Sequence, residues 1–262
     1  MTAVPFRDHF SAVAAQYAQA RPDYPPALFD WIASIAPARD RCWEAGCGSG
    51  QASRGLARVF ARVHATDPSA AQIGNARGPA NVDFAVEPGE ACSLADASAD
   101  AACVAQALHW FELPRFFAEC ERVLRPGGVL VAWGYQDIEL DADIADANAA
   151  LQARIRDDWP PERRFIDEGY ASFDFPFEPI AAPAFELRAE WTLPRLLGYF
   201  SSYSASKRHR ERRGEDPVAL HAEALAAAWG DPLRERTVRW PLFVHARRKP
   251  AAAAAPGCAK RD

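Results

Sequence analysis

A loop with glycine at every second position, Gly46, Gly48 and Gly50, constrains the fold more than any other part of this sequence. Cys42 and Trp43 before the loop predict a short buried strand, and residues 51–60 after it predict a helix. Glycine lets a chain leave a strand, turn sharply and enter a helix while its backbone lies against a ligand. The loop therefore predicts a strand–turn–helix unit, with either a ligand at the turn or a purely structural turn.

Short apolar strands alternate with helices through the rest of the first half. Further strands are expected at residues 62–66, 81–86, 101–106 and 129–133, and helices at residues 70–75 and 114–124. The run Arg-Pro-Gly-Gly at residues 125–128 is expected to stop the second of these helices. This alternation predicts an α/β fold with a doubly wound, Rossmann-like, mainly parallel sheet.

The flanking regions are expected to cover this sheet. Helices at residues 6–25 and 27–35 suggest an N-terminal helical lid over residues 1–38, before a cofactor-binding core at residues 39–135. A helix is expected at 141–159 and strands at 185–191 and 237–246. Residues 192–236 between those strands are too long for a simple connection and predict a helical cap. Residues 1–249 are thus expected to form a single domain, followed by a flexible tail at 250–262.

Charge and cysteine usage exclude several classes of protein. The chain has 30 Lys and Arg against 35 Asp and Glu, which gives a net charge of −5 and no electrostatic footprint of a nucleic-acid binder. No apolar run approaches the ~20 residues of a membrane helix, and the N-terminus has no signal pattern. None of the six cysteines forms a CxxC pair, so no metal is expected. We expect a cytoplasmic protein, monomeric or homodimeric, with no membrane or nucleic-acid partner.

Two acidic residues near the glycine loop narrow the choice of ligand. Asp67 ends the next predicted strand, about 20 residues after the first glycine, where a carboxylate can accept hydrogen bonds from ribose hydroxyls. The alternative for Asp67 is a turn or helix N-cap residue. Glu44 would repel a pyrophosphate and attract an ammonium or sulfonium. Gln51 stands where a dinucleotide-binding loop needs its third glycine.

Together with the runs QALHWF at 106–111 and LRPGG at 124–128, these residues resemble the class I S-adenosylmethionine-dependent methyltransferases. Within this superfamily the chain is similar to the small-molecule branch that includes trans-aconitate methyltransferase. The resemblance implies a seven-stranded sheet with the last strand antiparallel, S-adenosylmethionine as cofactor and S-adenosylhomocysteine as product. The methyl group would pass to a small-molecule acceptor by in-line displacement, and the branch suggests a carboxylate.

The resemblance also implies roles for individual residues. Gly46, Gly48 and Gly50 would pack against the methionine part of the cofactor, with Glu44 near its amino group. Asp67, followed by Pro68, would hold the ribose. The backbone of Gly89 and Glu90 would lie beside the adenine, whose amino group would contact either Glu87 or backbone alone, because Pro88 replaces the acid of many relatives. Gln106 and Ala107 would lie beside the sulfonium. Arg21 would hold the cofactor carboxylate, and Tyr17 lies four residues earlier on the same helical face, toward the substrate.

His109 and Trp110 follow the fourth strand, at the edge where α/β sites open. Trp110 would wall the methyl-transfer pocket. His109, the candidate catalytic residue, would act as a general base or as a hydrogen-bond partner of the acceptor; a carboxylate acceptor needs no base because it is already ionised. The alternatives to an enzyme of this family are a non-catalytic S-adenosylmethionine-binding protein and an NAD-dependent oxidoreductase.

Overall fold

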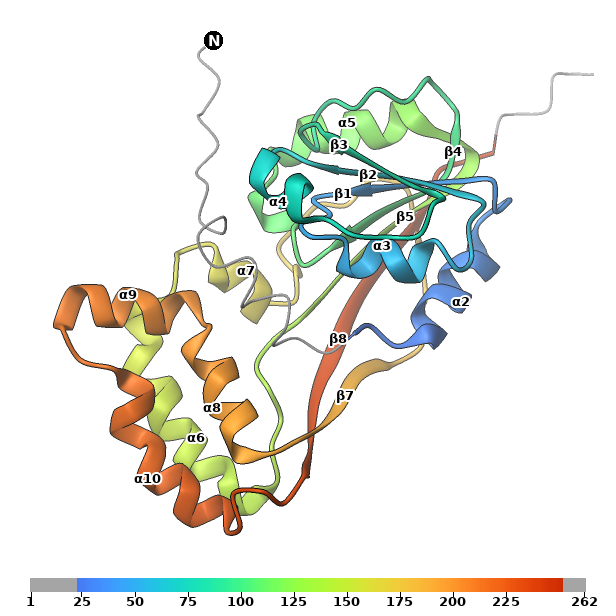
Figure 1. Cartoon of the computed structure of the whole chain (residues 1–262). Helices are drawn as coiled ribbons and strands as arrows, with labels where there is room; N and C mark the ends of the chain where they lie inside the picture. Colours follow the sequence, from blue (N-terminus) through green and yellow to red (C-terminus); the bar gives the residue numbers. More distant parts are fainter. Residues whose placement is uncertain (1–22, 252–262) are drawn as a thin grey trace, which may run out of the picture.

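An eight-stranded sheet forms the centre of the computed structural model, which describes residues 23–251 (Figure 1). Its order is β3-β2-β1-β4-β5-β8-β6, and β7 also pairs with β8. The strands are β1 (Arg41–Ala45), β2 (Arg62–Asp67), β3 (Val82–Val86), β4 (Ala99–Ala105), β5 (Leu124–Tyr135), β6 (Glu178–Ile180), β7 (Phe185–Trp191) and β8 (Arg236–Arg248). Neighbours among β1–β5 are parallel and β8 is antiparallel to β5, which confirms the expected fold class.

The expected number of seven strands is wrong, because the edge position of the sheet holds two strands end to end. β6 pairs with residues 246–248 of β8 and β7 with residues 236–242, both antiparallel and on the side away from β5. Pro183 lies in the break between them and has no N–H to donate to the ladder. The sheet therefore has seven positions but eight strands.

Helices pack on both faces of the sheet, as a doubly wound fold requires. Side chains of α2 and α3, such as Leu28 and Leu56, join one buried cluster, and those of α5, such as Phe116, join the other. Successive residues of one strand, Leu130 and Val131, enter opposite clusters. The helices on and beside the sheet are α2 (Pro26–Ile35), α3 (Gln51–Leu56), α4 (Ala70–Asn75), α5 (Leu113–Val123), α7 (Arg163–Asp167) and the 3-10 helix η1 (Leu108–Trp110).

Several element boundaries differ from those expected; β4, for example, begins at Ala99 rather than at residue 101. α3 ends at Leu56, and turns complete the segment that was expected to be helical as far as residue 60. β5 begins at Leu124, so residues 125–128 lie inside a strand rather than in a separate turn. The pairing shifts there, from Ala99 opposite Leu124 to Ala101 opposite Val129. This bulge accommodates Gly127, whose φ is +80°.

A second set of helices, here called the helical group, lies to one side of the sheet and is connected to it by the long strands β7 and β8 (Figure 1). α10 packs along α6, and α9 contacts η2. Its members are α6 (Ala142–Ile155), η2 (Arg156–Asp158), α8 (Leu193–Ser201), α9 (Ser204–Arg213) and α10 (Pro217–Trp229). α6 belongs to the group although it precedes residues 192–236. The division into lid, core and cap stays a prediction.

Several expectations fall outside residues 23–251. The helix expected at residues 6–25 lies almost entirely in the undescribed part of the chain, as does most of the tail at 250–262. Among the helices that the structure describes, none combines the length and the apolar character needed to cross a lipid bilayer. No group of three or more His, Cys, Asp or Glu side chains within this part of the chain is arranged to hold a metal ion.

Candidate functional site

The glycine loop follows β1 directly and is tied to the end of β2. The N–H groups of Gly46 and Cys47 both donate to the carbonyl oxygen of Thr66, at 2.8 and 3.0 Å. Gly46, Gly48 and Gly50 have φ values of +70°, +55° and +88°, a backbone region that residues other than glycine rarely adopt. The chain thus turns between β1 and α3, as the sequence predicts.

The three glycines differ in what surrounds them. A Cβ on Gly46 would lie 2.7 Å from the Cβ of Ala107, and one on Gly50 would lie 2.9 Å from the ring of Phe84. At Gly48 the nearest heavy atom would be 4.0 Å away. Gly46 and Gly50 are therefore required by packing, whereas Gly48 leaves open backbone surface where a ligand can lie. This surface fits the adenosine-type cofactor expected from the sequence.

Asp67 lies beside this open surface and bonds to the loop itself. Its Oδ2 accepts the N–H of Gly48 at 3.0 Å, and its Oδ1 accepts the N–H of Ser69 at 2.9 Å. Pro68 lies between these two contacts in the chain, and Ser69 caps α4. The turn role considered for Asp67 is therefore real. It is compatible with ribose binding, since each carboxylate oxygen can accept a further hydrogen bond.

Glu44 is buried on β1 below the loop, where the hydroxyl of Ser53 donates to its Oε2 at 2.5 Å. Burial raises the pKa of Glu44 to about 8; the nearby Asp67 acts in the same direction, and Ser53 and Arg54 oppose it. With this pKa the carboxyl is mostly protonated at neutral pH, and the negative charge expected from the sequence would form when a cation lies beside it.

Gly89 and Glu90 follow β3, and Gly89 lies against the same aromatic ring, that of Phe111, as Gly46. Glu90 Oε1 accepts the N–H of Glu112 at 2.8 Å. Glu87 Oε2 lies 3.0 Å from Nε2 of His64 and accepts the N–H of Ser93 at 3.1 Å. Both carboxylates are thus engaged within the protein, and the choice between Glu87 and backbone alone for the adenine contact stays a prediction.

Phe111, the last residue of the QALHWF run, was not singled out in the sequence. A Cβ on Gly46 would lie 3.1 Å from its ring, and one on Gly89 would lie 3.0 Å from it. The ring therefore fills the space between the two glycines and brings the β1 and β3 edges together. Its place at the end of the run was the available signal.

The side chain of Gln106 does not face the glycine loop. Its Nε2 donates to the carbonyl oxygen of Tyr135 at 3.1 Å, and its Oε1 accepts the N–H of Tyr135 at 2.9 Å. The residue has a φ of +55°. This pair of bonds joins the ends of β4 and β5. Only the backbone of Gln106, with Ala107 opposite Gly46, remains for a contact with the cofactor.

His109 lies on η1, after the end of β4. Its Nδ1 is 2.9 Å from the hydroxyl of Tyr170, and its ring centroid is 4.7 Å from that of Trp110. Burial, with a further effect of the charge on Arg163, lowers the pKa of His109 to about 3. The imidazole is therefore neutral at physiological pH. The other two site residues expected from the sequence, Tyr17 and Arg21, lie outside the described residues.

Arg163, on α7, and Tyr170, in the turn after α7, both act on His109. The sequence analysis did not single out either residue. Arg163 is paired with Asp137 at 2.7 Å and with Asp167 at 2.6 Å. Only the Glu168-Gly169 sequence before Tyr170, typical of a helix end, gave a hint of a turn there.

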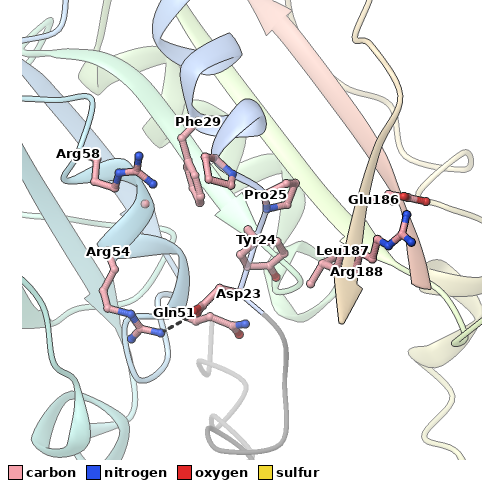
Figure 2. A pocket seen from close by; sticks show the side chains of 12 residues that line it. Asp23, Tyr24, Pro25, Phe29, Gln51, Arg54, Arg58, Glu186, Leu187 and Arg188 are labelled. Carbon is pink, nitrogen blue, oxygen red and sulfur yellow. Dashed lines mark hydrogen bonds and ion pairs between the residues drawn. The ribbon is translucent and has the colours of Figure 1, made fainter. Parts of the chain in front are cut away.

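A separate groove of about 500 Å³ borders α3 on the side of α2 and β7 (Figure 2). Arg54 pairs there with Asp23 at 3.1 Å, and Arg58 and Arg188 also line it. Among the residues that the structure describes, none of the expected site residues lines this groove. It is distinct from the surface at Gly48 and Asp67.

Comparison with known proteins identifies similar chains. Residues 43–132 match the family described as "Methyltransferase domain". A protein of Dictyostelium discoideum named as a methyltransferase is 32% identical over 87% of this chain and 89% of its own length. A solved structure from Anaeromyxobacter dehalogenans, named as a type II methyltransferase, is 46% identical and covers 88% of this chain and 99% of its own, with a TM-score of 0.85. A Saccharomyces cerevisiae protein named as an S-adenosylmethionine-dependent methyltransferase is 29% identical over 56% of this chain and 52% of its own length.

Proposed function

Because the chain belongs to the class I S-adenosylmethionine-dependent methyltransferases, we propose that it methylates a carboxylate oxygen of a small-molecule acceptor. The chain is thus an enzyme whose cofactor is S-adenosylmethionine, which supplies a methyl group on a positively charged sulfur. The family membership rules out the NAD-dependent alternative. A cytoplasmic location, and a monomer or homodimer, complete the proposal.

The cofactor site proposed here is the crevice between the glycine loop and the ends of β2, β3 and β4. Gly48 offers open backbone, and Asp67 beside it offers carboxylate oxygens for the ribose hydroxyls. Glu44, at the base of the loop, would ionise next to the ammonium group of the methionine part. The backbone of Gly89 and Glu90 would meet the adenine.

The hydrogen bond and the low pKa of His109 are the reasons for proposing a carboxylate acceptor. A phenol or an ammonium acceptor must lose a proton, and the site would then need a free base. The only candidate base singled out in the sequence is His109, whose Nδ1 is occupied by the hydroxyl of Tyr170 and whose pKa is far below neutrality. A carboxylate is ionised at pH 6–8 and requires no base.

Rate acceleration would then come from alignment and the exclusion of water. In-line transfer requires reacting atoms held about 3–3.5 Å apart. Trp110 and His109 would wall the acceptor side of the crevice, and the partly buried rings around them would keep water out.

A turnover screen over small carboxylic acids, phenols and amines, read out as S-adenosylhomocysteine release, tests this function. We expect turnover with a carboxylate and, at saturating cofactor, a rate that is flat from about pH 6 to 8. Turnover of phenols or amines alone would contradict the acceptor class, and cofactor binding without any turnover would favour the non-catalytic alternative. His109 is neutral throughout this range, so its titration does not contribute to the profile.

A further inference from the structure

Tyr170 is held rigidly and in an unusual backbone conformation. Its side chain is fully buried, its ring stacks on Phe173 and meets Phe243 edge-on, with both centroids 4.9 Å away. Its φ is +60°, directly after Gly169 at +58°. This backbone region is energetically unfavourable for a bulky residue. The surrounding structure therefore maintains strain in order to place this phenol.

The phenol hydroxyl has one available acceptor. Among residues 23–251, the 2.9 Å contact with Nδ1 of His109 is the one side-chain hydrogen bond of the Tyr170 hydroxyl. No backbone carbonyl in this part of the chain accepts from the hydroxyl either. A buried hydroxyl proton without an acceptor is unfavourable. The proton of Tyr170 therefore points to Nδ1.

The direction of this hydrogen bond determines the tautomer of the His109 imidazole. A neutral imidazole carries a single N–H, and the nitrogen that accepts from Tyr170 cannot be the one that bears it. Nε2 of His109 has no hydrogen-bond partner within the described part of the chain. Nε2 therefore carries the N–H and can donate a hydrogen bond, whereas the lone pair of Nδ1 is occupied by the hydroxyl of Tyr170.

We propose that Tyr170 is a positioning residue that fixes His109 as the Nε2–H tautomer, so that His109 donates a hydrogen bond to an oxygen of the methyl acceptor. The contact with the acceptor rests on the proposed function, whereas the tautomer does not. A carboxylate suits this arrangement, since one oxygen can accept from Nε2–H while the other attacks. A general-base role for His109 does not, because its lone pair faces Tyr170.

Imidazole ¹⁵N NMR of the full-length protein, without acceptor, tests the tautomer. The His109 signals are assigned by their loss in His109→Gln. We expect the protonated nitrogen to be Nε2 in the wild type and a mixture of tautomers in Tyr170→Phe, which removes only the hydroxyl. Tyr199→Phe is the matched control: it also removes a buried hydroxyl, one that accepts from Trp240 at 3.0 Å in the helical group, and should leave His109 unchanged.

A wild-type imidazole protonated at Nδ1, or an unchanged tautomer in Tyr170→Phe, would overturn the proposal. The wild-type spectrum decides the tautomer even if the variant does not fold. With an acceptor identified, Tyr170→Phe should raise its KM about fivefold while the Kd for S-adenosylhomocysteine stays unchanged. Failure of every carboxylate in the turnover screen would refute the acceptor class and leave the tautomer result standing.

Discussion

The crevice around the glycine loop and the helical group are stabilised in different ways. The crevice is built largely from backbone: N–H groups of the loop bond to the carbonyl of Thr66 and to Asp67, and glycines permit the close approach of strands. The helical group depends on side chains that meet across helices, such as buried His209 with Asp158 at 2.6 Å. Backbone-built sites leave a local pattern in the sequence, whereas side-chain pairs between distant segments do not.

The largest effect is expected at Gly48. Gly48→Val adds a side chain on the open surface of the crevice and strains a residue at φ +55°, so cofactor affinity should fall by more than about 100-fold. Gly214→Val is the matched control in the helical group, because Gly214 has φ +71° and also nothing near its Cβ position. Calorimetric titration with S-adenosylhomocysteine measures both. Equal affinity in the two variants would show that the loop does not contact the cofactor.

Asp158→Asn, in the helical group, should lower stability without changing cofactor affinity. Asp158 is buried and accepts from His209 and from Arg212, the latter at 2.7 Å, so loss of its charge should lower the free energy of unfolding by about 3–5 kcal/mol. Urea unfolding measures the loss, and the folded variant should keep wild-type affinity for S-adenosylhomocysteine. A fall in affinity equal to that of a crevice variant would mean that the helical group shapes the cofactor site.

Asp67→Ala should weaken binding of the cofactor by about 2–3 kcal/mol, since the ribose hydroxyls lose a charged acceptor. Asp67 also accepts the N–H of Gly48, so part of the loss would act through the loop. S-adenosylhomocysteine and free methionine distinguish the two effects: methionine binding should fall less if the ribose contact dominates. Wild-type affinity for S-adenosylhomocysteine would remove Asp67 from the site.

The smallest effect concerns the proton on Glu44. Its pKa is raised to about 8, so a cationic ligand must displace this proton, and affinity for S-adenosylhomocysteine should rise about tenfold between pH 6 and 7. Without ligand, the same shift stabilises the fold below about pH 4.5 and loses this contribution as pH rises through about 8. Calorimetric titration with S-adenosylhomocysteine between pH 6 and 7 measures how affinity changes with pH, and Glu44→Gln should abolish this change. A slope that persists in this variant would assign the proton to another group.

Local patterns predicted the elements of the crevice closely. α4 has the expected bounds, β2 and β3 each differ by one residue from theirs, and Asp67 ends β2 beside the loop, at the place its spacing indicated. The predicted strand bounds and strand number were wrong where pairing with distant residues determines them. β5 starts at Leu124 because this residue pairs with Ala99. The edge of the sheet holds two strands because β8 is long enough to pair with both.

The sequence by itself determined the order of β1 to β5 along the chain, the turn at the three glycines and the family, because these depend on neighbouring residues and short spacings. Only the tertiary structure decided the chemistry of the side chains. The proton on Glu44 depends on burial below the loop, and the tautomer of His109 depends on Tyr170, 61 residues away along the chain. A pKa or a hydrogen-bond direction is set by everything that surrounds a group in space, and folding brings those surroundings from separate parts of the chain.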